Sequence, residues 1–225
     1  MAHNPKLYRF GEKYYLYYIS SRSGPTRGHV RDSQRTGVAV ADTLPGPYRR
    51  SDQPIVEPSA PVFNVTVNPA VAQMTDGRYL MMLKGDLAPK APTDAVAQRV
   101  QGIAVADRPG GPFCIQPELA IRDINTEDAA LWWDAARSKY FAVFHAYTYI
   151  GLIESTDGFR WGQAKHYRVV VGNELKKVDG TMLRTRPPLQ RPDVFIEDGL
   201  PRALTLAIPE DQDWYCAVIS LKPSR

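Results

Sequence analysis

The chain has 225 residues, of which 44% are hydrophobic and 23% are charged, and this composition is typical of a globular protein. Its formal net charge is +4, and no run of five or six basic residues concentrates that charge, so a nucleic-acid partner is not predicted. No apolar stretch approaches the roughly 18 residues of a membrane span, so no membrane partner is predicted either.

The two cysteines, Cys114 and Cys216, are far apart and show neither metal-ligand spacing nor the pattern of a disulfide framework. We therefore expect them to be buried free thiols, which leaves the redox compartment open. No basic-then-apolar signal peptide follows Met1, and the localisation stays open as well.

The predicted elements are strands, because short β-branched and aromatic runs are bounded by Gly, Pro and Asp. They fall into four successive groups. Each group begins with a short strand, a turn and a second strand, and a third strand follows at a variable distance. The predicted first strands are 7–10, 70–74, 130–134 and 194–198; the second strands are 13–20, 78–85, 139–146 and 202–208; the third strands are 37–42, 102–107, 151–156 and 215–220.

Parts of these groups repeat in sequence. GVAVAD at 37–42 returns as GIAVAD at 102–107, and LPGPY at 44–48 is matched by RPGGPF at 108–113. No window shows a convincing helical period, so we expect little helix, and residues 86–98 are predicted as a loop with at most one helical turn. Repeated units of three or four strands indicate β-propeller blades, here about four; the alternative is a β-sandwich with fortuitous similarity.

Polar or acidic residues stand at the head of each predicted blade. Because the first strand of a propeller blade lines the central axis, we expect the four heads to converge at one end of the tunnel. The alternative is a rim of solvated loop residues. The heads are His3-Asn4-Pro5, Asn68-Pro69, Glu127-Asp128 and Arg191-Pro192-Asp193.

Taken together, these motifs resemble the five-bladed β-propeller glycoside hydrolases, in particular families 43 and 117. The start HNPKLYRFGEKYYLYY is typical of their blade starts, TEDAALWWD is similar to an acidic blade opening, and RPDVFIEDGLPRAL to the next one. The resemblance implies an all-β fold of the five-bladed propeller type, with one domain over 1–225 and blades starting near 3, 67, 127 and 191. It also implies that HNPKLY opens the second blade and that the N-terminal blade is missing; a true four-bladed ring is the alternative.

Glycoside hydrolysis generally needs two carboxylates, one of which acts as a proton donor. By the resemblance, Asp128 takes the place of an assisting aspartate. The remaining catalytic candidates are the adjacent Glu127, His145 on the next strand, and Glu174 in the later loop GNELKKVDG at 172–180. Asn4 stands where a family 43 catalytic strand would carry Asp, and an amide cannot accept the proton of a water molecule.

Groups suited to binding sugar hydroxyls or stacking on a sugar ring are more numerous. The loop 21–35, with His29, is a further candidate for a pocket wall. Trp133 and Tyr147 are further candidates for stacking on a sugar ring, but packing between strands is favoured for Trp133. The predicted substrate-binding residues are His3, Asn4, Asn68, Lys84, Asp86, Trp132, Arg191 and Asp193.

The sequence therefore predicts a glycoside hydrolase-like protein that hydrolyses O-glycosidic bonds by acid–base catalysis, with a carbohydrate as partner and no cofactor or metal cluster. The sequence does not decide whether a cation lies on the propeller axis or what the oligomeric state is. This chain has no obvious general base, so it is expected to have little or no activity. The alternatives are a non-catalytic carbohydrate-binding or scaffold propeller and an inert fragment.

Overall fold

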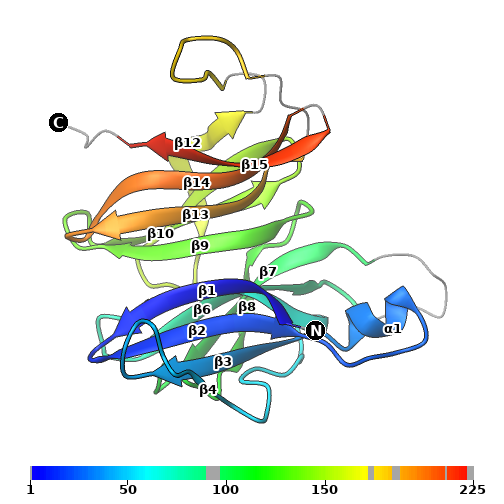
Figure 1. The fold of residues 1–225 in the computed structure, drawn as a ribbon. Coiled ribbons are helices and arrows are strands. Elements are labelled where there is room, and N and C mark those ends of the chain that lie inside the picture. Colours follow the sequence, from blue (N-terminus) through cyan, green and yellow to red (C-terminus); the bar gives the residue numbers. More distant parts are fainter. Residues whose placement is uncertain (1, 90–96, 172–174, 184–187, 211, 222–225) are drawn as a thin grey trace. The chain divides into compact units, whose positions relative to one another are not determined.

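The computed structural model describes residues 2–89, 97–171, 175–183, 188–210 and 212–221 (Figure 1). Within them the chain is built almost entirely of β-strands, as the sequence predicts, and the single described helix has six residues. None of the described helices is long and apolar enough to cross a membrane. The chain forms two compact units, Met1–Ile124 and Asn125–Arg225, each of which is described below by itself.

The first unit holds two antiparallel groups of strands. The first group runs β1-β2-β3 with the short β4 paired to β3, and the second runs β5-β6-β7-β8. A single parallel pair, Arg35 with Thr66, joins β3 to β5. The elements are β1 (Ala2–Phe10), β2 (Lys13–Ser20), α1 (Arg27–Asp32), β3 (Arg35–Ala41), β4 (Arg49–Arg50), β5 (Phe63–Gln73), β6 (Tyr79–Asp86), β7 (Arg99–Ala106) and β8 (Cys114–Ile121).

The second unit holds two further antiparallel groups, in the orders β12-β11-β10-β9 and β13-β14-β15. The last group has three strands among the described residues. The elements are β9 (Glu127–Asp134), β10 (Lys139–Ala146), β11 (Tyr149–Ser155), β12 (Gly162–Val171), β13 (Gln190–Glu197), β14 (Leu200–Glu210) and β15 (Asp213–Ser220).

Strand alternation places one set of side chains of each group in a core, because successive residues point to opposite faces. In the first unit, Tyr17 and Val38 pack with Val71, Met81 and Leu83. In the second unit, the corresponding core joins the two groups of strands through residues that include Ala130, Val143, Ile150, Leu204, Leu206 and Ile208.

The structure differs from the sequence-based expectations in two places. Cys114 and Cys216 are free, as predicted, but the prediction that they are buried is wrong, because both lie exposed on strands at the edges of their sheets. The loop 21–35 contains α1, whose N-terminus is capped by Thr26: its hydroxyl accepts a hydrogen bond from the backbone N–H of His29 at 3.1 Å. Most of the predicted loop 86–98 lies outside the described residues.

Candidate functional site

The four predicted blade heads share one backbone device. In the first strand of each group, two consecutive residues face a single residue of the second strand, which is a β-bulge. The register shifts place Asn4-Pro5 against Tyr18, Asn68-Pro69 against Leu83, Asp128-Ala129 against Phe144, and Arg191-Pro192 against Leu206.

The first residue of every bulge has a left-handed backbone, with φ of 52° at Asn4, 53° at Asn68, 51° at Asp128 and 52° at Arg191. Asn and Asp tolerate this conformation better than other residues with a side chain, which explains three of the four choices. In three heads the second residue is proline, which has no N–H to leave unpaired at the break in the ladder. The four heads are therefore structurally equivalent positions.

In the first unit the heads form polar contacts with each other and with the loop before β3. The side-chain amide of Asn4 donates a hydrogen bond from Nδ2 to Oδ1 of Asn68 at 3.2 Å. The Nε2 atoms of His3 and Gln34 lie 3.4 Å apart. Asn4 and Asn68, which the sequence places 64 residues apart, are thus brought into direct contact.

Asp86, at the end of β6, is 1% exposed and is held by two partners. Its oxygens accept hydrogen bonds from Nη2 of Arg31 on α1, at 2.8 and 3.1 Å, and from Nδ2 of Asn64, at 2.8 Å. Burial works to lower the pKa of the Arg31 guanidinium, but its hydrogen bonds and ion pairs with Asp86 and Asp32 outweigh this and raise it. The Asp86 carboxylate therefore anchors α1 to the sheet.

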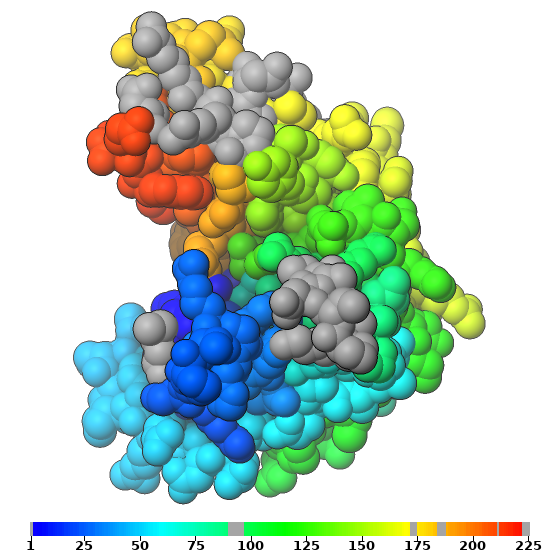
Figure 2. Space-filling view, turned by 90° about the vertical axis from the view of Figure 1, so that its right-hand side faces the viewer, coloured from blue at the N-terminus to red at the C-terminus, as the bar shows by residue number. Residues whose placement is uncertain are grey.

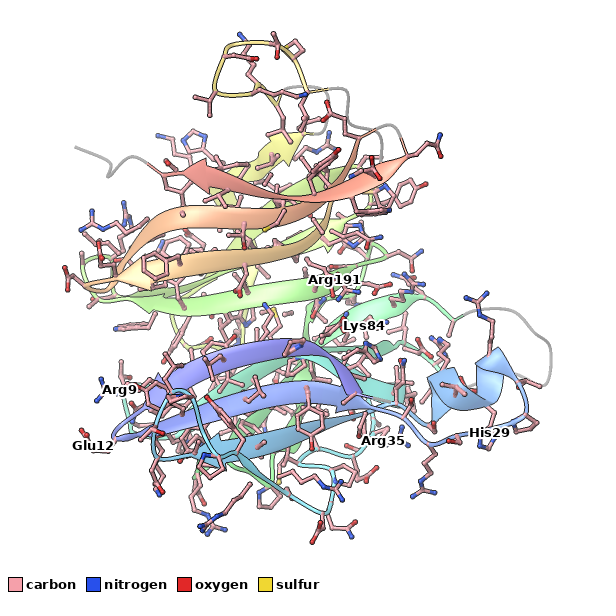
Figure 3. The ribbon with its side chains drawn as sticks, viewed as in Figure 1. Arg9, Glu12, His29, Arg35, Lys84 and Arg191 are labelled. Carbon is pink, nitrogen blue, oxygen red and sulfur yellow. The ribbon has the colours of Figure 1, made fainter. Side chains whose placement is uncertain are left out.

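Lys84 lies on the same strand, buried, two residues before Asp86 and opposite Val67 and Gln101. Figure 3 shows Lys84, Arg35 and His29 at the end of the sheet that carries α1, and Arg9 and Glu12 at the other end. The helix itself forms part of the surface of this unit (Figure 2). The loop 21–35 is thus a wall beside the polar end of β6.

Sequence reasoning missed Arg31, Asn64 and Gln34 in this cluster. One signal was available, because a carboxylate at the end of an otherwise apolar strand such as β6 needs a charged or hydrogen-bonding partner when it is buried. The identity of that partner depends on a contact between residues 55 positions apart.

In the second unit, Asp128 is buried at the bulge of β9. Glu127 lies directly across the ladder from His145 of β10, so a carboxylate and an imidazole are cross-strand neighbours on one face of the sheet. Asp193 and Arg191 are exposed at the start of β13, and Oδ1 of Asp193 accepts a hydrogen bond from the backbone N–H of Val194 at 3.1 Å. This unit therefore carries both acidic and basic groups at its two heads.

The aromatic candidates are placed differently from one another. Trp132 stacks on Phe141 with ring centroids 5.7 Å apart and packs against the core of the second unit. The ring centroids of Trp133 and Tyr140 lie 4.6 Å apart, which agrees with packing between strands. Tyr147 is exposed in the turn after β10 and has a left-handed backbone with φ of 57°.

Glu174 lies outside the described residues. Within the part of the chain that the structure describes, no three His, Cys, Asp or Glu side chains are grouped so as to hold a metal ion.

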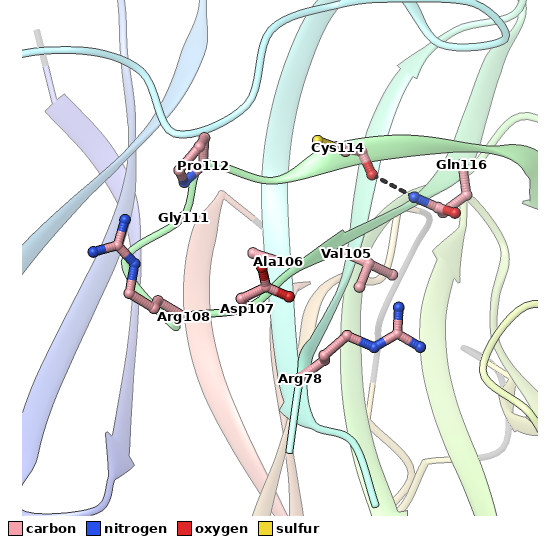
Figure 4. Close-up of a pocket in the computed structure, with 9 residues that line it drawn as sticks. All are labelled: Arg78, Val105, Ala106, Asp107, Arg108, Gly111, Pro112, Cys114 and Gln116. Carbon is pink, nitrogen blue, oxygen red and sulfur yellow. Dashed lines mark hydrogen bonds between the residues drawn. The ribbon is translucent and has the colours of Figure 1, made fainter. Parts of the chain in front are cut away.

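A pocket of about 350 Å³ in the first unit contains none of the predicted residues (Figure 4). It lies where β6 begins and β7 ends, at the opposite end of these strands from Lys84 and Asp86. Its two guanidinium groups, of Arg78 and Arg108, lie on different sides of Asp107 and do not converge on one point.

Comparison with known proteins gives a likeness in structure and none in sequence: no family model and no curated protein matches the chain. An α-L-arabinofuranosidase from Lactobacillus brevis is similar over 96% of this chain and 71% of that protein, with a TM-score of 0.68 and 14% identity. An endo-1,4-β-xylanase from Bacteroides thetaiotaomicron is similar over 100% and 72%, with a TM-score of 0.65 and 16% identity.

A family 117 glycoside hydrolase from Zobellia galactanivorans is similar over 91% of this chain, which spans 53% of that structure, with a TM-score of 0.61 and 16% identity. Identities this low establish the fold alone. The chain therefore has the all-β fold of the five-bladed β-propeller glycoside hydrolases and supplies about four blades of it.

Proposed function

We propose that this protein binds an oligo- or polysaccharide and hydrolyses its O-glycosidic bonds by general acid–base catalysis. The observation that carries the proposal is the buried carboxylate of Asp128 at one of four equivalent bulges. Bulges are frequent beside active sites because they re-aim a side chain out of the regular ladder. The structural likeness to enzymes that cleave glycosidic bonds supports the same reaction class.

The second unit supplies the groups for proton transfer. Asp128 assists the reaction, and its neighbour Glu127 and the facing His145 are the candidates for the proton donor, because a carboxylic acid or an imidazolium can each protonate a leaving oxygen. A second carboxylate must serve as base or nucleophile on the other side of the sugar. Asn4 cannot serve in that role.

Sugar hydroxyls are bound by the polar heads and by Lys84, through neutral and charge-assisted hydrogen bonds. Asp86 has a different role, because Arg31 and Asn64 already hold its oxygens. Its function is to position the wall formed by α1. The residues proposed to contact sugar are His3, Asn4, Asn68 and Lys84 in the first unit and Trp132, Arg191 and Asp193 in the second, each set taken by itself.

The test is release of reducing sugar from a panel of arabinose-, xylose- and galactose-containing polysaccharides. Asp128→Asn should lower kcat by about 10²–10⁴, the range for loss of a group that takes part in proton transfer. Asp198→Asn is the matched control, because Asp198 has the same left-handed backbone (φ 52°) in the turn between β13 and β14. Unchanged activity in Asp128→Asn would contradict the proposed role.

A second candidate function is carbohydrate binding without hydrolysis, and the amide of Asn4 in place of a carboxylate favours it. In that case the wild-type protein would release no sugar from any substrate but would bind an oligosaccharide saturably in calorimetry. Arg191→Ala should then weaken binding at least tenfold. Absence of both hydrolysis and binding across the panel would leave neither function standing.

A further inference from the structure

The excess positive charge of the chain belongs to the first unit. Residues 1–124 contain 15 Lys and Arg but 11 Asp and Glu, whereas residues 125–225 contain 13 of each. The loop 21–35, which forms the wall beside the polar end of β6, concentrates this charge, because it contains four arginines and a single carboxylate, that of Asp32. The loop is therefore the strongest candidate in this unit for binding an anion.

The loop has a defined shape. The backbone N–H of Arg22 donates a hydrogen bond to Oγ of Ser33 at 3.0 Å, which ties the beginning of the loop to the residue that ends α1. Oγ of Ser33 donates in turn to the carbonyl of Val30 at 2.8 Å. A Cβ at Gly24 would overlap Cδ2 of His29, so the imidazole packs directly on the backbone of the loop. The loop therefore presents its other side chains from a fixed backbone.

Two of the four arginines hold the loop in place. Arg31 pairs with Asp86 at 2.8 Å and with Asp32 at 3.1 Å. Nε of Arg35 pairs with Oε2 of Glu57 at 2.9 Å, and its Nη1 donates to three backbone carbonyls. The charges of these three carboxylates are therefore already balanced by structural arginines.

Arg22 and Arg27 are the other two arginines, and both are exposed. Within the described part of the chain, their side chains have no hydrogen-bonding or ion-pair partner. Arg27 begins α1 and Arg22 is tied to its other end, and six helical residues rise about 9 Å. Two cations spaced along one wall suit an extended molecule with repeated negative charges better than a single small anion. The helix lies toward the viewer in Figure 2.

The wall stands beside the heads that are proposed to bind sugar. The Nε2 atoms of His3 and Gln34 lie 3.4 Å apart, which brings the loop up to the head of β1. Figure 3 shows His29, Arg35 and Lys84 at this same end of the sheet. A sugar chain bound at these heads can therefore extend along the wall, and this favours a polysaccharide over a nucleic acid as the anionic partner.

We propose that the loop 21–35 binds the anionic substituents, carboxylates or sulfate esters, of an acidic polysaccharide through Arg22 and Arg27. The planar guanidinium donates paired, charge-assisted hydrogen bonds to the oxygens of such groups. This inference rests on the proposed binding of carbohydrate and names the class of carbohydrate.

The test compares matched ligands by calorimetry at low ionic strength, where exposed charges are screened least. Oligogalacturonides are compared with their methyl esters, which keep the backbone and lose the charge. Carrageenan oligosaccharides are compared before and after desulfation. The charged member of one pair should bind about tenfold more tightly, as expected for hydrogen bonds to a charged group. Preference within the first pair identifies a carboxylate as the bound group, and preference within the second identifies a sulfate ester.

The double variant Arg22→Gln/Arg27→Gln should reduce this preference to about twofold or less. The matched control is Arg49→Gln/Arg50→Gln, which removes the same two charges from the exposed strand β4, paired with the part of β3 that lies away from α1. The control should keep the preference. Equal melting temperatures of the two double variants would exclude unfolding as the cause of the difference.

Several outcomes would overturn the proposal. Equal binding of the charged and neutral members in both pairs would do so while leaving carbohydrate binding intact. A preference that persists in Arg22→Gln/Arg27→Gln would place the anion elsewhere. Equal affinity for single-stranded DNA of the same charge would show a surface for polyanions in general. Binding of no oligosaccharide, in this set or among arabinose-, xylose- and galactose-containing ligands, would overturn the proposed function together with this inference.

Discussion

The two units use the same bulge for different chemistry. In the first unit both bulges begin with asparagine, and Asn4 and Asn68 are hydrogen-bonded to each other. In the second unit the corresponding residues are Asp128 and Arg191, which carry opposite charges. The backbone position is thus set by the fold, whereas the side chain at that position decides which polar contacts and which charge the head offers.

The polar residues near the heads also differ in burial between the two units. Asp86 in the first unit is buried and held by Arg31 and Asn64, so its charge serves to fix α1. Asp193 and Arg191 in the second unit are exposed. We therefore expect substitutions of the first unit's polar cluster to change stability, and substitutions of the second unit's heads to change activity.

The largest effect on stability is expected for Asp86→Ala. Removing one partner of a buried ion pair typically costs about 3–5 kcal/mol, and because the Arg31 side chain keeps 32% of its surface exposed, we expect a value near the lower limit. Urea denaturation measures the change. The double variant Arg31→Met/Asp86→Ala should recover part of the loss, since no buried charge is then left alone.

The control is Asp42→Ala, whose carboxylate pairs with Lys13 at 2.6 Å on the exposed surface and should change stability little. Equal effects of Asp86→Ala and Asp42→Ala would contradict the structural role of Asp86 in the first unit.

A smaller loss of stability is expected when the bulge residue Asn68 is replaced. Asn68→Ala loses the hydrogen bond with Asn4 and places alanine in a left-handed backbone, which together should cost about 2 kcal/mol. Asn68→Gly loses only the hydrogen bond and should be less destabilising. Thermal denaturation of both variants, beside Asp128→Ala and Asp128→Gly, should give the same order in the two units. A glycine variant less stable than its alanine counterpart would show that backbone conformation does not set these positions.

The smallest loss of stability at neutral pH is expected when Tyr17, in the core of the first unit, is replaced. Burial raises the pKa of its phenol well above the usual value, and its Oη donates a hydrogen bond to the carbonyl of Pro109 at 2.6 Å. The folded chain therefore keeps this proton when the unfolded chain has lost it. The contribution of the Tyr17 phenol to the free energy of unfolding is constant below about pH 10. Above that pH it decreases by about 1.4 kcal/mol per pH unit.

The measurement is the free energy of unfolding in urea at several pH values between about 8 and 11. Tyr17→Phe should lose about 1 kcal/mol at neutral pH, from the missing hydrogen bond, and should show a shallower decline at high pH. An identical slope in wild type and Tyr17→Phe would indicate that the phenol titrates normally in the folded chain.

Most of the strand pattern could be predicted from the sequence. The runs 13–20 and 139–146 match β2 and β10 at both ends, because each is a dense apolar run bounded by turn residues. The strands β8 and β12 were not placed individually, since their charged and proline-containing sequences resemble loops. The helix α1 was missed because six residues are too few to show a helical period.

The candidate site was predictable only in part. The head motifs identify the four bulge positions, since Asn-Pro and Asp stand out at the start of apolar strands. The bulge could not be predicted, because it depends on the register between two strands and not on either strand alone. The pairing of Arg31 with Asp86 depends on where the chain folds back, which no local pattern specifies.

The bulge has a consequence for how such a protein changes over evolutionary time. The residue that begins it stands outside the regular ladder, so its replacement disturbs neither the pairing of the strands nor the alternation of the core. The four heads carry Asn, Asn, Asp and Arg on one backbone conformation, which shows how widely the side chain varies. A single nucleotide change can convert Asn to Asp at such a position. Gain or loss of a charged group at a head is therefore a short mutational step in this architecture.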